Sequence, residues 1–235
     1  MEKLRKLYEG KAKILYETAD PELLIQHFKD DATAFNAAKR GTIVQKGILN
    51  NQISTRVFKY LEGHGIPTHY VRTLSDRDML VRRLEIVLIE VVVRNTVAGS
   101  LAKRLGLEEG TPLQSPVLEF YYKSDALGDP MINDDHIRLL GLATPAEVQA
   151  IREQAMKINA TLLPFFAQRD ILLVDFKVEF GRHRGRLLLG DEITPDGCRL
   201  WDRTTREKMD KDRFRRDLGR VEEAYQEVHR RVCGT

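Results

Sequence analysis

The sequence contains little cysteine, and this excludes two common kinds of stabilising site. Only Cys198 and Cys233 carry thiols, and they lie far apart in a chain of 235 residues. They lack the short spacing that holds a structural zinc ion, and two thiols cannot build a disulfide framework. This usage is typical of the reducing cytosol, so we expect a cytoplasmic location.

Long hydrophobic runs and a strong charge imbalance are also missing. The apolar runs are short and interrupted, which argues against a membrane-spanning helix. Residues 1–13 contain five lysines and arginines but no apolar core, so we expect no secretory signal. The net charge of +3 is too small to indicate a nucleic-acid partner. With 42% hydrophobic and 31% charged residues, the chain is globular and long enough for one large domain or two small ones.

The stretch Leu173–Ile193 carries the strongest pattern in the sequence. Its first part alternates between an apolar face (Val174, Phe176, Val178 and Phe180) and a charged face (Asp175, Lys177 and Glu179). Gly181 and Gly185 bracket a basic turn, and Arg186–Gly190 is predicted to return as the second strand of a hairpin. A register that pairs odd with odd residues brings Asp191 to the charged face, and a slip of one residue sends it to the other side.

The charged face of this hairpin has two interpretations. Three acids grouped around one lysine suit a magnesium-nucleotide site, because magnesium takes carboxylate oxygens and phosphate oxygens accept hydrogen bonds from ammonium groups. The alternative is a solvated strand face held by cross-strand ion pairs. Spacing alone leaves both interpretations open.

A second basic turn lies near the start of the sequence. Residues 3–8 and 12–18 are predicted strands joined at Glu9-Gly10, with Lys11 and Lys13 beside the turn. Glycine lets the backbone approach a phosphate group, and the two ammonium groups supply positive charge. The turn lacks the glycine-rich span and the serine or threonine of a Walker loop, so an ordinary basic hairpin is the alternative.

Helix signals occur at three places. The pair Asp20-Pro21 is typical of a helix start and predicts a short helix that ends at Phe28. A second helix is predicted over Gln45–Leu61, with the pair Asn50-Asn51 in contact with solvent in its first turns. A third and longer helix is predicted over Thr144–Gln168, which starts with a capping box.

The run Ile86–Arg94 is apolar at most positions and predicts a central strand covered on both faces. It ends in Arg94, and Val97–Leu105 then starts a helix with Ser100 in its opening turn. An arginine at a strand end beside a helix start can bind an anion, because the guanidinium, the hydroxyl and the free helix amides all donate hydrogen bonds. The alternative is an arginine that simply closes a strand.

Five stretches of the sequence together resemble one family, the SAICAR synthetases, nearly from end to end. They are YEGKAK at Tyr8–Lys13, EVVVRNTVAGS at Glu90–Ser100, LVDFKVEFG at Leu173–Gly181, GDEITPDGCRLWD at Gly190–Asp202 and MDKDRFR at Met209–Arg215. Each stretch is a modest signal, but the five in this order are highly specific. The sequence departs from the family pattern at Leu88, where many relatives have proline or alanine, and at Ala37, where many have glycine.

The resemblance implies an activity. SAICAR synthetases are ATP-dependent ligases of purine biosynthesis that join carboxyaminoimidazole ribonucleotide (CAIR) to L-aspartate through an amide bond, with conversion of ATP to ADP and phosphate. The reaction is expected to pass through a phosphorylated carboxylate. We therefore expect ATP, CAIR and L-aspartate as small-molecule partners and Mg²⁺ as cofactor. We expect a homodimer with no nucleic-acid or membrane partner.

The same resemblance implies the residues of the nucleotide site. Lys11 and Lys13 would bind the ATP phosphates under the N-terminal hairpin. Glu179 and Asp191 would hold Mg²⁺ against those phosphates, and Asp129 is the candidate ligand of a second metal ion.

The resemblance also implies the residues of the reacting and ribonucleotide sites. Lys177 would neutralise charge where the phosphoryl group meets the substrate carboxylate. Asp175 would orient either Lys177 or a substrate hydroxyl. Arg94 and Ser100 would bind the 5′-phosphate of the ribonucleotide, and Arg199 would assist them.

The implied fold is α+β with two lobes. A small, mainly antiparallel N-terminal lobe over residues 1–84 would carry the phosphate-binding hairpin. A larger mixed lobe over residues 85–235 would carry the metal and ribonucleotide sites, with the ATP cleft between the lobes. Two other classes of function are alternatives. A kinase-like small-molecule phosphotransferase could use the same Mg-ATP site, although the H-R-D and D-F-G patterns are absent, and an RNA-binding protein would need basic residues interleaved with aromatic ones.

Overall fold

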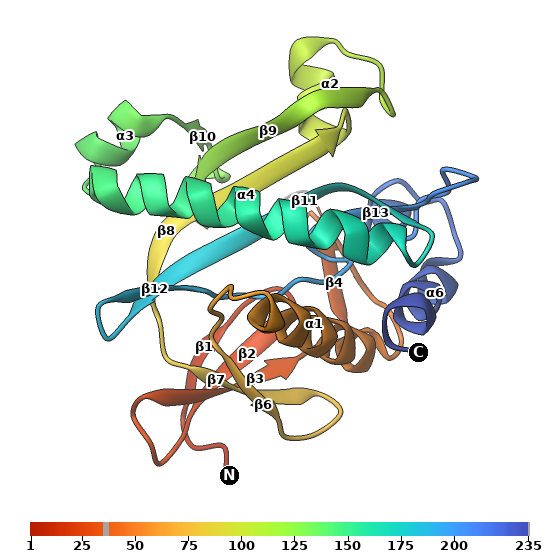
Figure 1. Ribbon diagram of the computed structural model, residues 1–235. Coiled ribbons are helices and arrows are strands. Elements are labelled where there is room, and N and C mark those ends of the chain that lie inside the picture. The colour runs from red at the N-terminus through yellow and green to blue at the C-terminus, as the bar shows by residue number, and fades with distance from the viewer. Residues whose placement is uncertain (35–37, 235) are drawn as a thin grey trace.

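The computed structural model describes residues 1–34 and 38–234, and in it two sheets stand one above the other with helices packed around them (Figure 1). Ala37, one of the two departures from the family pattern, lies outside the described residues. None of the described helices combines the length and the hydropathy that crossing a lipid bilayer requires.

The lower sheet in Figure 1 is antiparallel and has five strands. In spatial order they are β1 (Lys6–Glu9), β2 (Lys13–Glu17), β3 (Leu23–Phe28), β7 (Asp78–Arg82) and β6 (Tyr70–Thr73). A separate small hairpin consists of β4 (Asp31–Ala34) and β5 (Lys39–Thr42). Helix α1 (Lys46–Gly63) packs against β3, β6 and β7, and so covers one face of this sheet.

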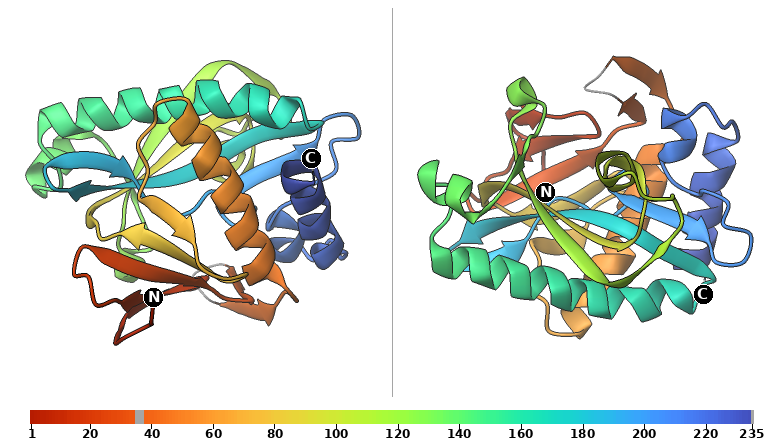
Figure 2. Two further views of the ribbon diagram at one scale, coloured as in Figure 1. Left: turned by 60° about the horizontal axis from the view of Figure 1, so that its bottom comes forward. Right: turned by 90° about the horizontal axis from the view of Figure 1, so that it is seen from above.

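The upper sheet contains the longest strands of the molecule. Its path runs through β10 (Met131–Ile132), β9 (Pro112–Tyr122), β8 (Glu85–Thr96), β11 (Ile171–His183) and β12 (Arg186–Leu189), and β13 (Cys198–Asp202) also pairs with β11. The helices that follow β8 in the chain are α2 (Gly99–Leu105), α3 (Asp134–Leu139), α4 (Pro145–Ala167), α5 (Asp212–Arg215) and α6 (Val221–Cys233). Both views in Figure 2 show α4 lying along the sheet, where it packs against β8 and β11.

One hydrophobic core joins the two sheets. It contains Leu24 of β3, Val57 of α1, Val91 of β8, Leu162 of α4 and Val178 of β11, all of them buried. Because this core is shared, the two sheets hold each other in position. The charged face of β11 is thereby carried on a rigid element whose other face is packed under α4.

The prediction of a short helix after Asp20 is wrong, because this segment forms strand β3. The Asp20 carboxylate accepts a hydrogen bond from the backbone N–H of Glu22, which makes a turn and not a helix cap. Residues from Leu23 to Phe28 then pair with β2 on one side and β7 on the other. Two complete rows of inter-strand hydrogen bonds outweigh a local cap signal. The other two helices are confirmed as α1 and α4, and the predicted N-terminal hairpin is confirmed as β1–β2.

The register of the β11–β12 hairpin also differs from the expectation. Phe180 pairs with Leu189 and His183 pairs with Arg186, so even-numbered residues face odd-numbered ones. A regular continuation of β12 would carry Asp191 to the apolar side. Asp191 does not lie on the apolar side, because β12 ends at Leu189 and because the φ of 57° at Asp191 turns the chain out of the strand.

The two central strands depart from the predicted pattern at one position each. The pairing of β11 with β13 is irregular between Leu173 and Asp175, and Val174 consequently packs with Ala98 and Trp201, away from the main core. On β8, Leu88 is 43% exposed, so this strand is central but is not covered on both faces. The uncovered face of β8 forms part of the wall of a cavity.

Candidate active site

A cavity lies between the two sheets and has two adjoining parts. The larger part, which we call the large chamber, has a volume of about 910 Å³. It is lined by the β1–β2 hairpin, by β7, β8 and β11, and by four residues of the segment after β12, namely Asp191, Glu192, Asp196 and Gly197. The small chamber has a volume of about 330 Å³ and lies at the far end of β8 and β11. The two chambers adjoin, because they share lining residues, among them Glu90, Asp129, Lys177, Asp196 and Lys211.

The large chamber has an apolar region beside its charged region. The apolar side chains that line it are Leu15, Leu24, Val81, Leu84, Ile86 and Leu88. His69 lines the same chamber, and its Nε2 is buried without a hydrogen-bond partner. Burial lowers the pKa of His69 to about 3, and the charges of Lys13 and Arg82 contribute to this shift. The ring is therefore neutral at physiological pH and faces a space large enough for a flat heterocyclic base.

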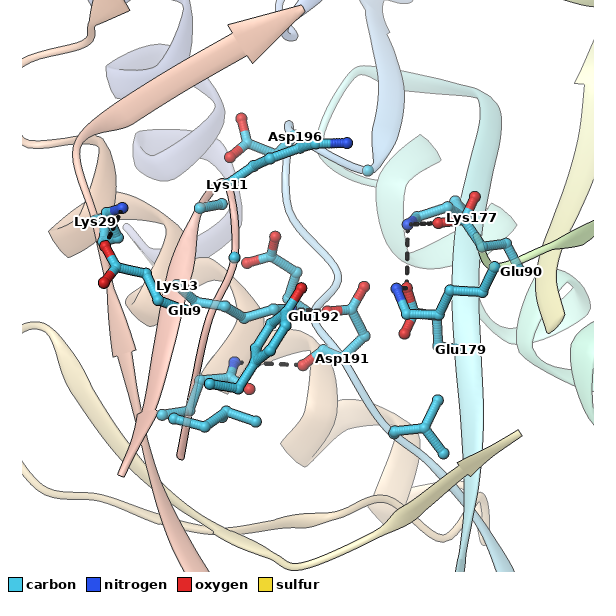
Figure 3. A pocket seen from close by; sticks show the side chains of 18 of the residues that line it. Glu9, Lys11, Lys13, Lys29, Glu90, Lys177, Glu179, Asp191, Glu192 and Asp196 are labelled. Carbon is cyan, nitrogen blue, oxygen red and sulfur yellow. Dashed lines mark hydrogen bonds and ion pairs between the residues drawn. The ribbon is translucent and has the colours of Figure 1, made fainter. Parts of the chain in front are cut away.

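The two N-terminal lysines have different surroundings. Lys13 reaches from the hairpin toward the opposite wall (Figure 3), where its ammonium group forms an ion pair with Asp191. Burial lowers the pKa of Lys13, and the negative charges of Glu192 and Glu179 oppose this shift. Lys11 is more exposed and pairs with Asp125 at 2.7 Å. The structure thus places both lysines at the chamber, but only Lys13 lies within its charged interior.

Lys177 lies where the two chambers meet, and two carboxylates hold its ammonium group. Its Nζ donates to Glu90 Oε1 at 2.6 Å and to Glu179 Oε1 at 3.2 Å (Figure 3). Burial alone would lower the pKa of Lys177, but Glu179 and Glu90 raise it above its ordinary value. Burial would likewise raise the pKa of Glu179, but Lys177, Lys123 and Lys13 lower it to about 2. Both groups are therefore charged at neutral pH.

Of the three acids expected around Lys177, only Glu179 bonds to it. Asp191 pairs with Lys13, and Asp175 bonds to two arginines. The second carboxylate that bonds to Lys177 is Glu90, which was not predicted from the sequence. A signal for it existed, because Glu90 is the one charged residue within the apolar run from Ile86 to Val93, and the structure places it directly opposite Glu179.

Buried charges of alternating sign line the small chamber. Arg94 is 3% exposed and donates to Glu119 at 2.7 Å, to Asp175 at 2.9 Å and to Ser100 Oγ at 2.8 Å. Arg199 donates to the same Oδ2 of Asp175 at 2.9 Å. The carboxylate of Asp175 thus holds two guanidinium groups next to each other, beside the first turn of α2.

The chain of ion pairs continues past Arg199. Its Nε donates to Asp212 Oδ2 at 2.9 Å, and Asp212 also accepts from Arg215 at 2.6 Å. Burial would lower the pKa of Arg199, but Asp175 and Asp212 raise it above its ordinary value. Since Arg199 and Arg215 both line the small chamber, its wall is rich in fixed hydrogen-bond donors.

The carboxylates expected to bind metal do not form a complete ligand cluster in the described residues. Glu179, Asp191 and Asp129 all line the large chamber, but the described residues contain no cluster of three acidic, histidine or cysteine side chains that could hold a metal ion. Asp129 Oδ1 accepts a hydrogen bond from the backbone N–H of Ser124. This arrangement fits magnesium, which proteins commonly bind through one or two carboxylates together with the phosphates of a nucleotide.

No sequence signal marked several buried polar residues behind the cavity. The pair Asn50-Asn51 was expected in solvent, but both side chains are completely buried. Asn50 Nδ2 donates to Asp196 at 3.1 Å, and Lys46 Nζ donates to the same carboxylate at 2.6 Å. Polar residues on a helix usually face solvent, and only tertiary structure shows that this end of α1 points at the cavity.

Comparisons with known proteins agree on one family. A model of the SAICAR synthetase family matches residues 6–232. The phosphoribosylaminoimidazole-succinocarboxamide synthase of Chlorobaculum parvum is 58% identical over 232 residues, which cover 99% of this chain and 99% of that protein. The protein of the same name from Caldanaerobacter subterraneus is 57% identical with the same coverage.

Solved structures show the same similarity in three dimensions. The phosphoribosylaminoimidazole-succinocarboxamide synthase of Ehrlichia chaffeensis superposes with a TM-score of 0.95 at 47% identity, covering 97% of this chain and 98% of that one. A SAICAR synthetase in complex with ADP superposes with a TM-score of 0.94 at 48% identity, covering 97% of each chain. The α+β, two-lobed fold expected from the resemblance is therefore confirmed.

The burial of His69 predicts a dependence of stability on pH. The unfolded chain binds a proton at this residue near pH 6.5, whereas the folded protein does so only near pH 3. The free energy of unfolding should therefore fall as the pH falls through this window, by roughly 2 kcal/mol between pH 7 and pH 5. His69→Gln should remove this part of the pH dependence, as measured by urea unfolding at both pH values. The exposed His64→Gln is the matched control, and equal pH dependence in wild type and His69→Gln would contradict the prediction.

The pairing of Arg94 predicts that its removal destabilises the fold. In Arg94→Ala two buried carboxylates, Glu119 and Asp175, each lose a partner, which should lower the free energy of unfolding by about 3–5 kcal/mol. The control is Arg138→Ala, which breaks an exposed ion pair with Asp135 and should cost less than about 1 kcal/mol. Denaturant unfolding measures both values. A loss in Arg94→Ala no larger than in the control would show that the buried network contributes little.

Proposed function

The chain belongs to the SAICAR synthetase family, and we propose that it binds ATP in the large chamber and the ribonucleotide in the small one. It is a phosphoribosylaminoimidazole-succinocarboxamide synthase, an ATP-dependent ligase of purine biosynthesis. We propose that CAIR and L-aspartate are joined through an amide bond while ATP becomes ADP and phosphate. The observation that carries this division is that Lys177 lies where the two chambers meet.

The large chamber suits a nucleoside triphosphate. Its apolar region fits a purine base, and the unpartnered Nε2 of His69 offers that base a hydrogen bond. Lys13 and Lys11 lie at the charged end, where the phosphates would be bound. A triphosphate would replace Asp191 as the partner of Lys13 and so compensate for the loss of that ion pair.

Glu179 and Asp191 are the residues that would hold Mg²⁺, with Asp129 as the candidate for a second ion. Two carboxylates are a sufficient protein contribution when phosphate oxygens complete the coordination. When bound, the metal supplies positive charge that offsets the charge of the phosphates. Freed from Lys13 by the incoming phosphates, Asp191 would be available for this role.

Lys177 would act as a fixed positive charge at the reacting centre. Its raised pKa keeps it protonated, so it is suited to stabilise negative charge and not to accept a proton. We propose that a CAIR carboxylate oxygen attacks the terminal phosphorus of ATP, ADP leaves, and an acyl phosphate forms. The free amine of L-aspartate then attacks the acyl carbon, the bond from that carbon to the phosphate oxygen breaks, and inorganic phosphate leaves and takes up the proton that the amine loses.

The small chamber suits the 5′-phosphate of the ribonucleotide. Arg199 and Arg94 line it, and Ser100 in the first turn of α2 accepts a hydrogen bond from Arg94. Arg94 is buried and bonded to Glu119 and Asp175, so Arg199 would make much of the direct contact, and Ser100 would act mainly through its hydrogen bond with Arg94. Asp175 would then serve chiefly to hold the two guanidinium groups in position. Lys177 would be oriented by Glu90 and Glu179, because its ammonium group donates hydrogen bonds to these two acids.

Three further expectations stay predictions: the division into lobes of residues 1–84 and 85–235, the homodimer and the cytoplasmic location. β7 ends at Arg82 and β8 begins at Glu85, so a boundary near residue 84 would separate the two sheets. Sedimentation equilibrium would test the dimer.

The activity is tested by leaving out one substrate at a time. With ATP, CAIR and L-aspartate all present, purified protein should release phosphate and form an equal amount of the amide, identified by mass spectrometry. A kinase-like phosphotransferase would instead transfer phosphate to a stable product without L-aspartate. Formation of such a product at the rate seen with all three substrates would overturn the proposal.

The surroundings of the two N-terminal lysines predict unequal effects. Lys13→Ala removes an ammonium group from the charged interior, and we expect the KM for ATP to rise about ten-fold or more. Lys11→Ala removes a more exposed group and should raise it by less. Steady-state kinetics with each substrate varied in turn measures both effects. An effect of Lys13→Ala confined to the KM for CAIR would show that the hairpin covers the other substrate.

A further inference from the structure

We propose that Lys46 and Tyr225 are positioning residues, which act through the buried carboxylate of Asp196 on the backbone of Lys177 and Lys211. Neither side chain is among those that line the two chambers. The inference rests on the proposed function in one respect, since it takes Lys177 to act at the reacting centre. It adds to that function a link between the active site and two helices, α1 and α6, that lie behind it.

Three donors converge on Asp196. Lys46 Nζ donates to Oδ2 at 2.6 Å, Asn50 Nδ2 donates to Oδ2 at 3.1 Å, and the hydroxyl of Tyr225 donates to Oδ1 at 2.6 Å. Lys46, Asn50 and Tyr225 are all completely buried. Burial would raise the pKa of Asp196, but Lys211 and Lys46 lower it, so the carboxylate stays ionised. An ionised group in such a place is restricted to the one position at which its donors meet it.

The donors come from opposite ends of the sequence. Lys46 and Asn50 belong to the first turns of α1, whereas Tyr225 belongs to α6, which packs against α1. The ring of Tyr225 is held in a separate apolar cluster with Ala32, Ile43 and Leu49. The clamp on Asp196, defined as Lys46, Asn50 and Tyr225, is therefore fixed by helix packing and not by a loop.

The loop that the clamp holds is bonded directly to the backbone of two cavity lysines. Gly197, next to Asp196, accepts a hydrogen bond from the N–H of Lys177 at 2.9 Å. Pro195, on the other side, accepts one from the N–H of Lys211 at 3.1 Å. Both lysines line both chambers. A shift of this loop would therefore move two of the positive charges at the junction of the chambers.

The side chain of Asp196 also acts on Lys211 directly. Its Oδ1 lies 4.0 Å from Lys211 Nζ. Burial lowers the pKa of Lys211, and the negative charge of Asp196 opposes that shift. Catalysis by fixed charges is sensitive to small displacements, and a misplacement of about 1 Å can cost about 100-fold in rate. A clamp that keeps this loop in place therefore bears on turnover more than on the affinity for either large substrate.

The direct test is Tyr225→Phe, which removes one oxygen atom and leaves the ring in its apolar cluster. We expect kcat to fall about ten-fold, while the KM for ATP changes by less than about two-fold because the Lys13 region is untouched. The matched control is Tyr70→Phe, since Tyr70 is also a buried tyrosine and its hydroxyl is 3.1 Å from Thr73 Oγ1. Tyr225→Phe should lose more stability than the control, because its hydroxyl bonds a buried carboxylate, but only Tyr225→Phe should lose kcat. An unchanged kcat in Tyr225→Phe would overturn the proposal.

A second variant removes a different donor to Asp196. Asn50→Leu retains much of the side-chain volume and should lower kcat in the same direction, again with little change in the KM for ATP. If Tyr225→Phe does not fold, this variant decides the question alone. A kcat in folded Asn50→Leu equal to that of wild type would then reject the clamp.

Amide hydrogen exchange without substrates separates this inference from the proposed function. In Tyr225→Phe, the N–H groups of Lys177 and Lys211 should exchange faster than in wild type, and in Tyr70→Phe they should not. If wild type forms no amide product, the proposed function fails, but the exchange result still tests the clamp. Equal exchange in Tyr225→Phe and wild type would refute it, whatever the enzyme catalyses.

Discussion

The ion pair of Lys177 with Glu90 and Glu179 is the interaction on which the active site depends. A charged group withdrawn from water is tolerated only when opposite charges and hydrogen bonds replace its hydration. β11 brings Lys177 and Glu179 to the cavity because its other face is packed under α4, and β8 supplies Glu90 from the adjacent strand. The fold thus fixes a positive charge at the junction of two chambers, before any substrate arrives.

The same rule governs the rest of the cavity. Lys13 has Asp191, Arg94 has Glu119 and Asp175, and Arg199 has Asp175 and Asp212. These partners hold the donors in place, which favours electrostatic stabilisation by groups that need little reorganisation during the reaction. Under the proposed function, an incoming phosphate would compete with a carboxylate already present. Binding would then be an exchange of partners, and Asp191 would gain its proposed metal role through that exchange.

The two-lobed fold and the roles of the candidate residues came from the resemblance to a family, whereas single elements were predictable from the sequence for physical reasons that differ from place to place. The alternation along β11 is a local property of the chain, so the charged face was predictable. The route of Asp191 to the cavity was not, because it depends on where β12 stops and on one positive φ. The Asp20 cap signal was overruled by strand pairing on both sides of β3. Lys46 and Tyr225 could not have been chosen from local pattern, since only the packing of α1 against α6 brings them together.

The most direct test of the central claim is Lys177→Met, because it removes the charge at the junction and keeps much of the side chain. Binding of Mg-ATP and of CAIR, each measured alone by calorimetry, should change by less than about ten-fold. Amide formation in a single turnover at saturating substrates should fall by roughly 100-fold or more, as expected for a group that stabilises charge in the transition state. A variant that loses affinity for ATP but regains the wild-type single-turnover rate at saturating ATP would contradict this role for Lys177.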